Sequence, residues 1–139
     1  MAVKSNMIFV NLPVKDLQAS IRFFNALGFE FNPDFTDENA GCLVIGDNIF
    51  AMLLMEPFFQ SFTTKAIADT SKTTEVMVAI SADSRAQVDE LADKALASGG
   101  SVAGDPQDHG FMYSRSFQDP DGHIWEVVYM EQAAEGGQA

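Results

Sequence analysis

The feature that most constrains the fold is an internal repeat, because one order of secondary-structure signals occurs twice along the chain. Each copy predicts a strand, a helix and three further apolar segments. The first copy has them at 7–14, between Asp16 and Gly28, and at 29–35, 41–45 and 49–55. The second has them at 74–80, between Ser84 and Gly99, and at 101–103, 111–117 and 124–130. The repeat predicts two tandem βαβββ modules and an α+β fold.

The two helices carry clear start and stop signals. Asp16 supplies a side-chain acceptor suited to an N-cap, and Ser84 with Gln87 forms a capping-box pattern. Gly28 and Gly99 end the helices, because glycine tolerates the left-handed conformation there. One apolar stripe at helical spacing follows each start. The stripes are Leu17, Ile21, Phe24 and Leu27, then Val88, Leu91, Ala92, Ala95 and Leu96.

The length of 139 residues fits a single domain that contains both modules. We place the first module at 7–57 and the second at 73–131. Residues 58–72 are expected to form a linker with room for one helical turn. Residues 132–139 are small and polar, and we expect them to form a disordered tail.

Composition excludes several classes of function. The net charge is −12, from 20 acidic and 8 basic residues, and a nucleic-acid backbone would be repelled by it. No apolar run reaches the roughly 20 residues that span a bilayer, and the N-terminus lacks a signal-peptide pattern. Cys42 is the one cysteine, so no internal disulfide forms. We therefore expect a cytoplasmic protein that binds neither nucleic acid nor membrane.

Two motifs carry a resemblance to a known family. The first is Val-Lys-Asp-Leu at 14–17, followed by a helix and Leu-Gly-Phe at 27–29. The second is Asp-Pro-Asp-Gly-His at 119–123, with Glu126 three residues later. Together they resemble the vicinal oxygen chelate superfamily, which includes glyoxalase I, extradiol dioxygenases, and fosfomycin- and bleomycin-resistance proteins. The resemblance implies a partly open barrel with a cleft, often a divalent metal, and often a homodimer.

The resemblance also indicates four positions where metal-binding members place their ligands. Here they hold Phe9, Ala51 (or Met52 if the turn differs by one residue), Glu75 and Glu126. Only the two glutamates can bind a metal, whereas a catalytic site usually has about three protein ligands. We therefore expect either no cofactor or a divalent metal of unknown identity. His123 lies on the strand face opposite Glu126, and His109 lies in a polar loop.

Glu75 and Glu126 are also the candidate catalytic residues. Alternation places Glu126 on one strand face with Ile124 and Val128. A carboxylate there can act as a general base, lie in a water-filled cleft, or pair with Arg115. A four-residue loop at 119–122 would place Arg115 opposite Glu126. A five-residue loop would place Ser116 there, with Ser114 on the same side, and the resemblance favours this arrangement.

The remaining candidates suggest an apolar ligand. Phe9 stands where a metal ligand would be, which indicates a cleft suited to a flat hydrophobic or aromatic molecule. The expected ligand-binding residues are Phe9, Asn11, Met77, Ser114 and Ser116, beside the two glutamates. Three phenylalanines, Phe58, Phe59 and Phe62, follow the first module. They would form a lid, form a dimer contact, or pack under the linker, and we favour the last.

Three functions remain open, and whether the chain is an enzyme is not decided. The favoured hypothesis is a glyoxalase/bleomycin-resistance-like protein that binds a small, partly apolar molecule without a metal. The second is a metal-dependent lyase, similar to lactoylglutathione lyase, or an enzyme similar to the extradiol dioxygenases. The third is a non-catalytic domain that binds another protein through sheet edges or the Phe58–Phe62 cluster. A homodimer is compatible with all three.

Overall fold

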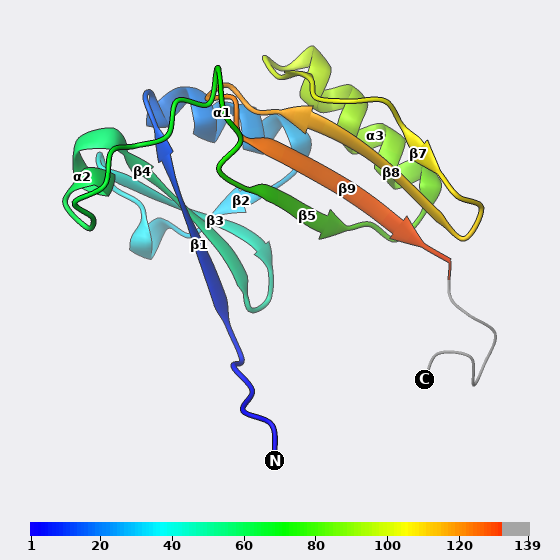
Figure 1. Ribbon diagram of the computed structural model, residues 1–139, viewed down its shortest axis with the longest axis horizontal. Helices are drawn as coiled ribbons and strands as arrows, with labels where there is room; N and C mark the ends of the chain where they lie inside the picture. Colours follow the sequence, from blue (N-terminus) through cyan, green and yellow to red (C-terminus); the bar gives the residue numbers. More distant parts are fainter. Residues whose placement is uncertain (132–139) are drawn as a thin grey trace. The chain divides into compact units, whose positions relative to one another are not determined.

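The computed structural model describes residues 1–131, and the expected tail at 132–139 lies outside this range. The chain divides into two compact units, Met1–Thr73 and a second that begins at Thr74. Each unit contains one β-sheet together with at least one α-helix (Figure 1). The α+β class and the two tandem modules are confirmed, and both sheets are open.

The first unit contains four strands, two α-helices and a 3-10 helix. They are β1 (Ile8–Val14), α1 (Leu17–Leu27), β2 (Glu30–Phe31), η1 (Pro33–Phe35), β3 (Ala40–Gly46), β4 (Ile49–Met55) and α2 (Glu56–Gln60). The sheet has the order β1-β4-β3-β2. Strand β1 runs parallel to β4, and the other neighbours are antiparallel.

Helix α1 begins and ends where the sequence predicts. The Asp16 side chain accepts a hydrogen bond from the Ala19 backbone N–H at 3.2 Å, and Gly28 ends the helix with a φ of 107°. Leu17, Phe24 and Leu27 of the apolar stripe are buried with residues from one face of the sheet, and Ile21 is partly exposed. This core contains Leu12, Val14, Leu17, Phe23, Phe24, Leu27, Leu43, Ala51 and Leu53. One face of the first sheet is therefore committed to the core, and the alternate residues point away from it.

The cap at Gly28 gives a stability prediction. We expect Gly28→Ala to lower the free energy of unfolding by about 1–2 kcal/mol, since a Cβ is disfavoured in the left-handed region. An added Cβ would meet no atom within 4 Å, so the loss comes from backbone conformation alone. Gly28→Asn should lose less, because asparagine tolerates this conformation. Urea unfolding followed by circular dichroism tests this, and equal losses for both variants would contradict it.

The second unit repeats the same plan with one extra strand. Its elements are β5 (Met77–Ser81), α3 (Arg85–Ala97), β6 (Ser101–Val102), β7 (Gln107–Asp108), β8 (Met112–Gln118) and β9 (Ile124–Met130). The sheet has the order β5-β9-β8-β6, and β7 also pairs with β8. Its core contains Val88, Ala92, Ala95, Phe117, Trp125 and Val127. The Ser84 side chain caps α3 by accepting from the Gln87 backbone N–H.

Three sequence predictions about strands need correction. Only Glu30–Phe31 of the segment 29–35 is a strand, because Pro33 begins a 3-10 helix that the Asn32 side chain caps. The first strand of the second unit begins at Met77 rather than Thr74, so Glu75 precedes it. Strand β7 lies in a loop that was expected to be irregular. No helix among residues 1–131 is long and apolar enough to cross a membrane.

Candidate functional site

The outward face of the first sheet carries the candidate residues of β1. Phe9 lies opposite Phe50 and Asn11 lies opposite Met52 in the parallel register of β1 and β4. The rings of Phe9 and Phe50 stack with their centroids 5.1 Å apart. Ala51 is fully buried in the core, so Met52 is the β4 residue that shares a face with Asn11. Of the two alternatives in the sequence, the structure therefore selects Met52.

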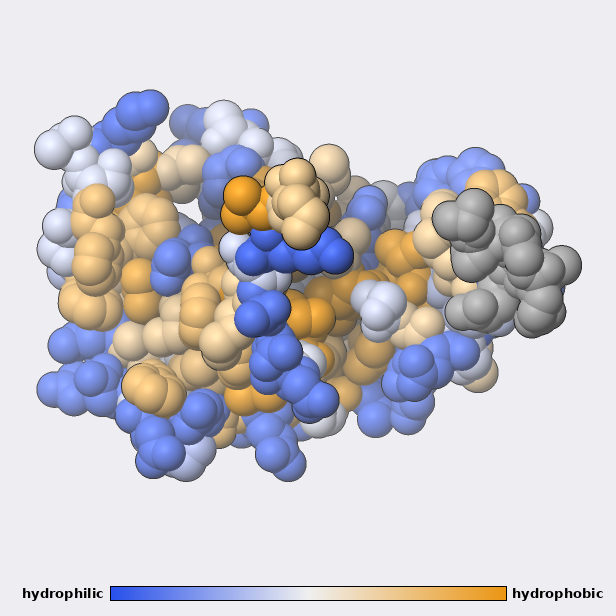
Figure 2. Space-filling view, turned by 90° about the horizontal axis from the view of Figure 1, so that it is seen from below, coloured by the Kyte–Doolittle hydropathy of each residue, from blue (hydrophilic) through white to orange (hydrophobic). Residues whose placement is uncertain are grey.

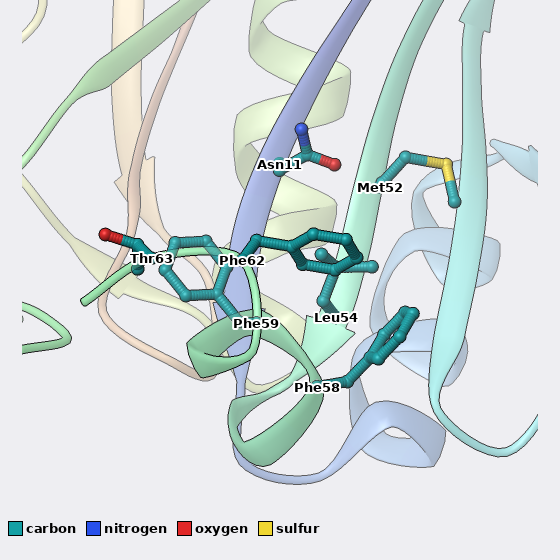
Figure 3. Close-up of a pocket in the computed structure, with 7 residues that line it drawn as sticks. All are labelled: Asn11, Met52, Leu54, Phe58, Phe59, Phe62 and Thr63. Atoms are coloured by element: carbon teal, nitrogen blue, oxygen red, sulfur yellow. The ribbon is translucent and has the colours of Figure 1, made fainter. Parts of the chain in front are cut away.

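A cavity of about 530 Å³ lies over this face (Figure 3). Asn11 and Met52 project from β1 and β4, and three aromatic rings come from α2 and the turn after it. The lining residues are Asn11, Met52, Leu54, Phe58, Phe59, Phe62 and Thr63. The cavity is thus mostly apolar, and Asn11 and Thr63 are the polar residues that line it.

The phenylalanines after the first module form one wall of this cavity, here called the aromatic wall (Phe58, Phe59 and Phe62). The rings of Phe58 and Phe62 meet edge to face, with centroids 5.0 Å apart. Both are exposed, Phe62 at 69%, so packing under the linker, which the sequence favoured, is wrong. Figure 2 shows apolar side chains exposed on the surface of the first unit. Phe9, Phe58 and Phe62 are among the exposed large hydrophobic residues of this unit.

Of the seven lining residues, the sequence predicted Asn11 as ligand-binding and named Met52 as an alternative at a metal-ligand position. Leu54, Phe58, Phe59, Phe62 and Thr63 were not predicted to line a ligand site. The alternation of β4 places Leu54 on the same face as Met52, so Leu54 could have been predicted from the sequence pattern. Thr63 lies in a segment without periodic signal, and its place follows from the fold of the turn after α2.

The register of β8 and β9 decides between the two loop lengths considered for the second unit. Ser116 pairs with Glu126, and Ser114 pairs with Val128. Arg115 points to the other face, where it donates to Asp89 at 3.1 Å and to Asp93 at 2.9 Å on α3. The arrangement with Ser116 opposite Glu126 is confirmed, and the pairing of Arg115 with a glutamate is wrong.

The other candidates of the second unit lie around β5 and β9. Met77 pairs with Ile124 and is exposed, and Ala79 is the β5 residue opposite Glu126. Glu126 itself is half-buried, and Ser114 is buried. Glu75 lies before β5, and its Oε2 lies 3.2 Å from Nδ1 of His123. The contact of Glu75 is thus to a histidine, and the roles of Glu75 and Glu126 as general bases stay predictions.

A buried polar cluster lies beneath the turn between β8 and β9. One carboxylate oxygen of Asp119 accepts from the Trp125 indole N–H at 3.0 Å. The other accepts from the backbone N–H of Asp121 at 2.9 Å and of His123 at 3.1 Å. Burial raises the pKa of Asp119, although the hydrogen bonds and His123 oppose this shift. The sequence predicted the turn but not that its first residue is a buried acceptor.

The residues at the four resemblance-derived positions do not fit a divalent metal. Phe9 and Met52, or Ala51, offer no oxygen or nitrogen donor. Glu75 contacts His123 through a carboxylate oxygen. Among residues 1–131, no group of three or more His, Cys, Asp or Glu side chains is arranged to hold a metal ion.

Comparison with known proteins places the chain in a family. A sequence model of the Glyoxalase/Bleomycin resistance protein/Dioxygenase superfamily matches residues 6–127. The chain therefore belongs to this superfamily, which confirms the resemblance. A search of curated proteins found no match.

Solved structures share the fold. Hypothetical protein SA1046 from S. aureus is 29% identical, with a TM-score of 0.75, covering 92% of this chain and 95% of that chain. Lactoylglutathione lyase from Agrobacterium tumefaciens is 22% identical, with a TM-score of 0.65 and coverages of 91% and 94%. Fosfomycin resistance protein FosX from Mesorhizobium loti is 16% identical, with a TM-score of 0.66 and coverages of 99% and 100%. At the identities of the last two, the likeness shows the fold alone.

Proposed function

We propose that this chain binds a small, partly apolar molecule in the cavity of its first unit, without a divalent metal. The observation that carries the proposal is the cavity itself, of about 530 Å³, with five of its seven lining side chains apolar. Pockets for small ligands typically measure about 300–1,000 Å³ and combine apolar walls with a few polar groups. Asn11 and Thr63 are the polar residues of the lining here, and the Asn11 side chain supplies an amide.

The lining also indicates what kind of molecule fits. Three phenylalanine rings offer flat surfaces, and aromatic ligands stack on such surfaces in offset or edge-to-face arrangements. The Asn11 amide can both donate and accept a hydrogen bond, and therefore suits a ligand with one polar end. Among the described residues, none that lines the cavity is charged. Together with a net charge of −12, this disfavours an anionic ligand.

Two fluorescent probes test the proposal. N-phenyl-1-naphthylamine is aromatic, apolar and uncharged, and 8-anilino-1-naphthalenesulfonate adds a sulfonate to the same skeleton. We expect the neutral probe to bind saturably with a Kd of about 1–100 μM, and the sulfonate about tenfold more weakly. EDTA should leave both affinities unchanged. The side-chain amide resonances of Asn11 should shift on titration with the neutral probe.

Three outcomes would contradict the proposal. One is the absence of saturable binding of the neutral probe. Another is binding that leaves the Asn11 amide unmoved, since the probe would then lie elsewhere. The third is binding abolished by EDTA, which would favour the metal-dependent lyase and dioxygenase classes. We also propose that the chain forms the homodimer that the resemblance implies. The molar mass of the protein in solution, measured by light scattering, tests this.

A further inference from the structure

We infer that Gln60 is the positioning residue of the aromatic wall and thereby sets which ligands the cavity accepts. This inference rests on the proposed function. The side-chain amide of Gln60 donates to the backbone carbonyl of Thr63 at 3.0 Å and to that of Lys65 at 2.7 Å. Phe62 and Thr63, which line the cavity, lie between this donor and its second acceptor in the chain.

The segment that carries the aromatic wall has little regular structure of its own. Helix α2 has five residues, and its N-cap Met55 makes no side-chain hydrogen bond to the helix. Helices this short are marginal in isolation, so neighbouring contacts must hold them. Lys15 and Glu56 form an ion pair at 3.0 Å at the start of α2, but it is exposed, and exposed pairs contribute little.

The turn after α2 is closed by backbone and side-chain hydrogen bonds. The backbone N–H of Phe62 donates to the Phe59 carbonyl at 3.0 Å, and that of Thr63 donates to the Gln60 carbonyl at 3.4 Å. The Ser61 hydroxyl donates to the Phe58 carbonyl at 2.6 Å, and the Thr63 hydroxyl accepts from the Lys65 backbone N–H at 3.1 Å. Each of these bonds ties residues two or three apart. The Gln60 amide reaches five residues along the chain, and so closes the whole segment 60–65 into a loop.

This loop fixes the position of Phe62 relative to Phe58. The Phe62 ring is largely exposed, so burial in a core does not hold it. Its edge-to-face contact with Phe58 joins the last turn of α2 to the segment that Gln60 closes. Gln60 is not among the residues that line the cavity. Its substitution therefore leaves the chemistry of the lining unchanged and alters only where the wall stands.

Gln60→Glu is the sharpest variant, because glutamate has nearly the same shape but, when ionised, no hydrogen to donate. Gln118→Ala is the matched control, since the Gln118 amide donates to the Val102 carbonyl at 3.1 Å in the second unit. The first readout needs no ligand. Met52 and Leu54 line the cavity together with the aromatic wall, so we expect their methyl resonances to carry ring-current shifts from it, which NMR of methyl-labelled protein would record.

We expect Gln60→Glu and Gln60→Ala to move both methyl resonances toward their random-coil positions, and Gln118→Ala to leave them in place. The affinity for N-phenyl-1-naphthylamine should fall about three- to tenfold, the range that one or two hydrogen bonds are worth. The preference for this probe over the bulkier triphenylmethanol should fall with it, because a loosened wall no longer excludes the bulkier molecule.

The two hypotheses fail in different ways. Unchanged methyl resonances in Gln60→Glu would overturn the inference about Gln60, even if the wild-type chain binds the probe. Methyl resonances that respond to Gln60→Glu, in a chain that binds no probe, would overturn the proposed function and leave the positioning of the wall supported. A response of the same size in Gln118→Ala would also overturn the inference, because the effect would then not be local to the wall.

Discussion

Replacing Asp119 with alanine should lower the free energy of unfolding by about 3–5 kcal/mol, because three N–H donors, two of them in buried hydrogen bonds, would lose their acceptor. These donors are the Trp125 indole and the backbone N–H groups of Asp121 and His123. Asp119, His123 and Trp125 are all buried, so water does not readily replace the lost carboxylate. Urea unfolding followed by circular dichroism measures the loss.

Asp119→Asn separates the charge of this residue from its shape. Asparagine keeps one oxygen acceptor but presents an amide N–H₂ group at the second position. We therefore expect a smaller loss than for alanine. Asp105→Asn is the control, since Asp105 is exposed in the loop before β7, and it should change stability by less than about 0.5 kcal/mol. Equal, small losses in Asp119→Ala and Asp105→Asn would contradict the role of the buried acceptor.

The pH dependence of the free energy of unfolding, compared between wild type and Asp119→Asn, is a second readout. Burial raises the pKa of Asp119 above the value of 3.8 for a free side chain. The folded protein therefore holds this proton at a pH where the unfolded chain has lost it. The contribution of Asp119 to stability falls as the pH rises from about 3.8 through the raised pKa, and is constant above it.

Other carboxyl groups act in the opposite direction, so the difference between wild type and Asp119→Asn is the quantity to measure. The Arg85 guanidinium lowers the pKa of Asp108 to about 2, which adds stability as the pH rises through the acid range. That contribution is common to both proteins and cancels in the difference. A stability difference that does not vary between pH 3 and pH 7 would contradict a raised pKa at Asp119.

Sequence signals predicted the elements whose causes are local. Asp16, Gly28 and Ser84 act within one turn of the backbone, and both helices begin and end as their caps indicate. The alternation of β9 placed Trp125 and Val127 on one face and Glu126 on the other, and the burial of the first two agrees with it. Alternation alone did not choose between Arg115 and Ser116 as the partner of Glu126, because a one-residue change in the loop reverses the face.

The candidate site was predicted only in part, for physical reasons that differ between residues. Asn11 was identified because strand parity puts it on the face away from α1. The aromatic wall was misassigned because Phe58 and Phe62 lie in a segment without periodicity, where sequence does not tell an exposed ring from a packed one. Glu75 was expected on the strand at 74–80, but β5 begins two residues after it. Its carboxylate is then free to reach the buried His123.

Met52→Trp should reduce the affinity for N-phenyl-1-naphthylamine about 100-fold, a loss of about 2.7 kcal/mol of binding free energy. Met52 is half-buried and lines the cavity opposite the aromatic wall, so an indole placed there takes the space that the probe would fill. Aromatic residues are favoured in strands. The substitution is therefore expected to change the free energy of unfolding by less than about 1 kcal/mol.

Phe50→Trp is the matched control for this experiment. Phe50 lies on the same strand and the same face, two residues before Met52, where its ring stacks on Phe9 and does not line the cavity. It should leave probe affinity within about twofold of wild type, a difference of ~0.4 kcal/mol. If Met52→Trp binds the probe as tightly as Phe50→Trp does, the ligand site is not this cavity. If both lose binding equally, the site lies nearer Phe9 on the outward face of β1, where the sequence first placed the apolar ligand.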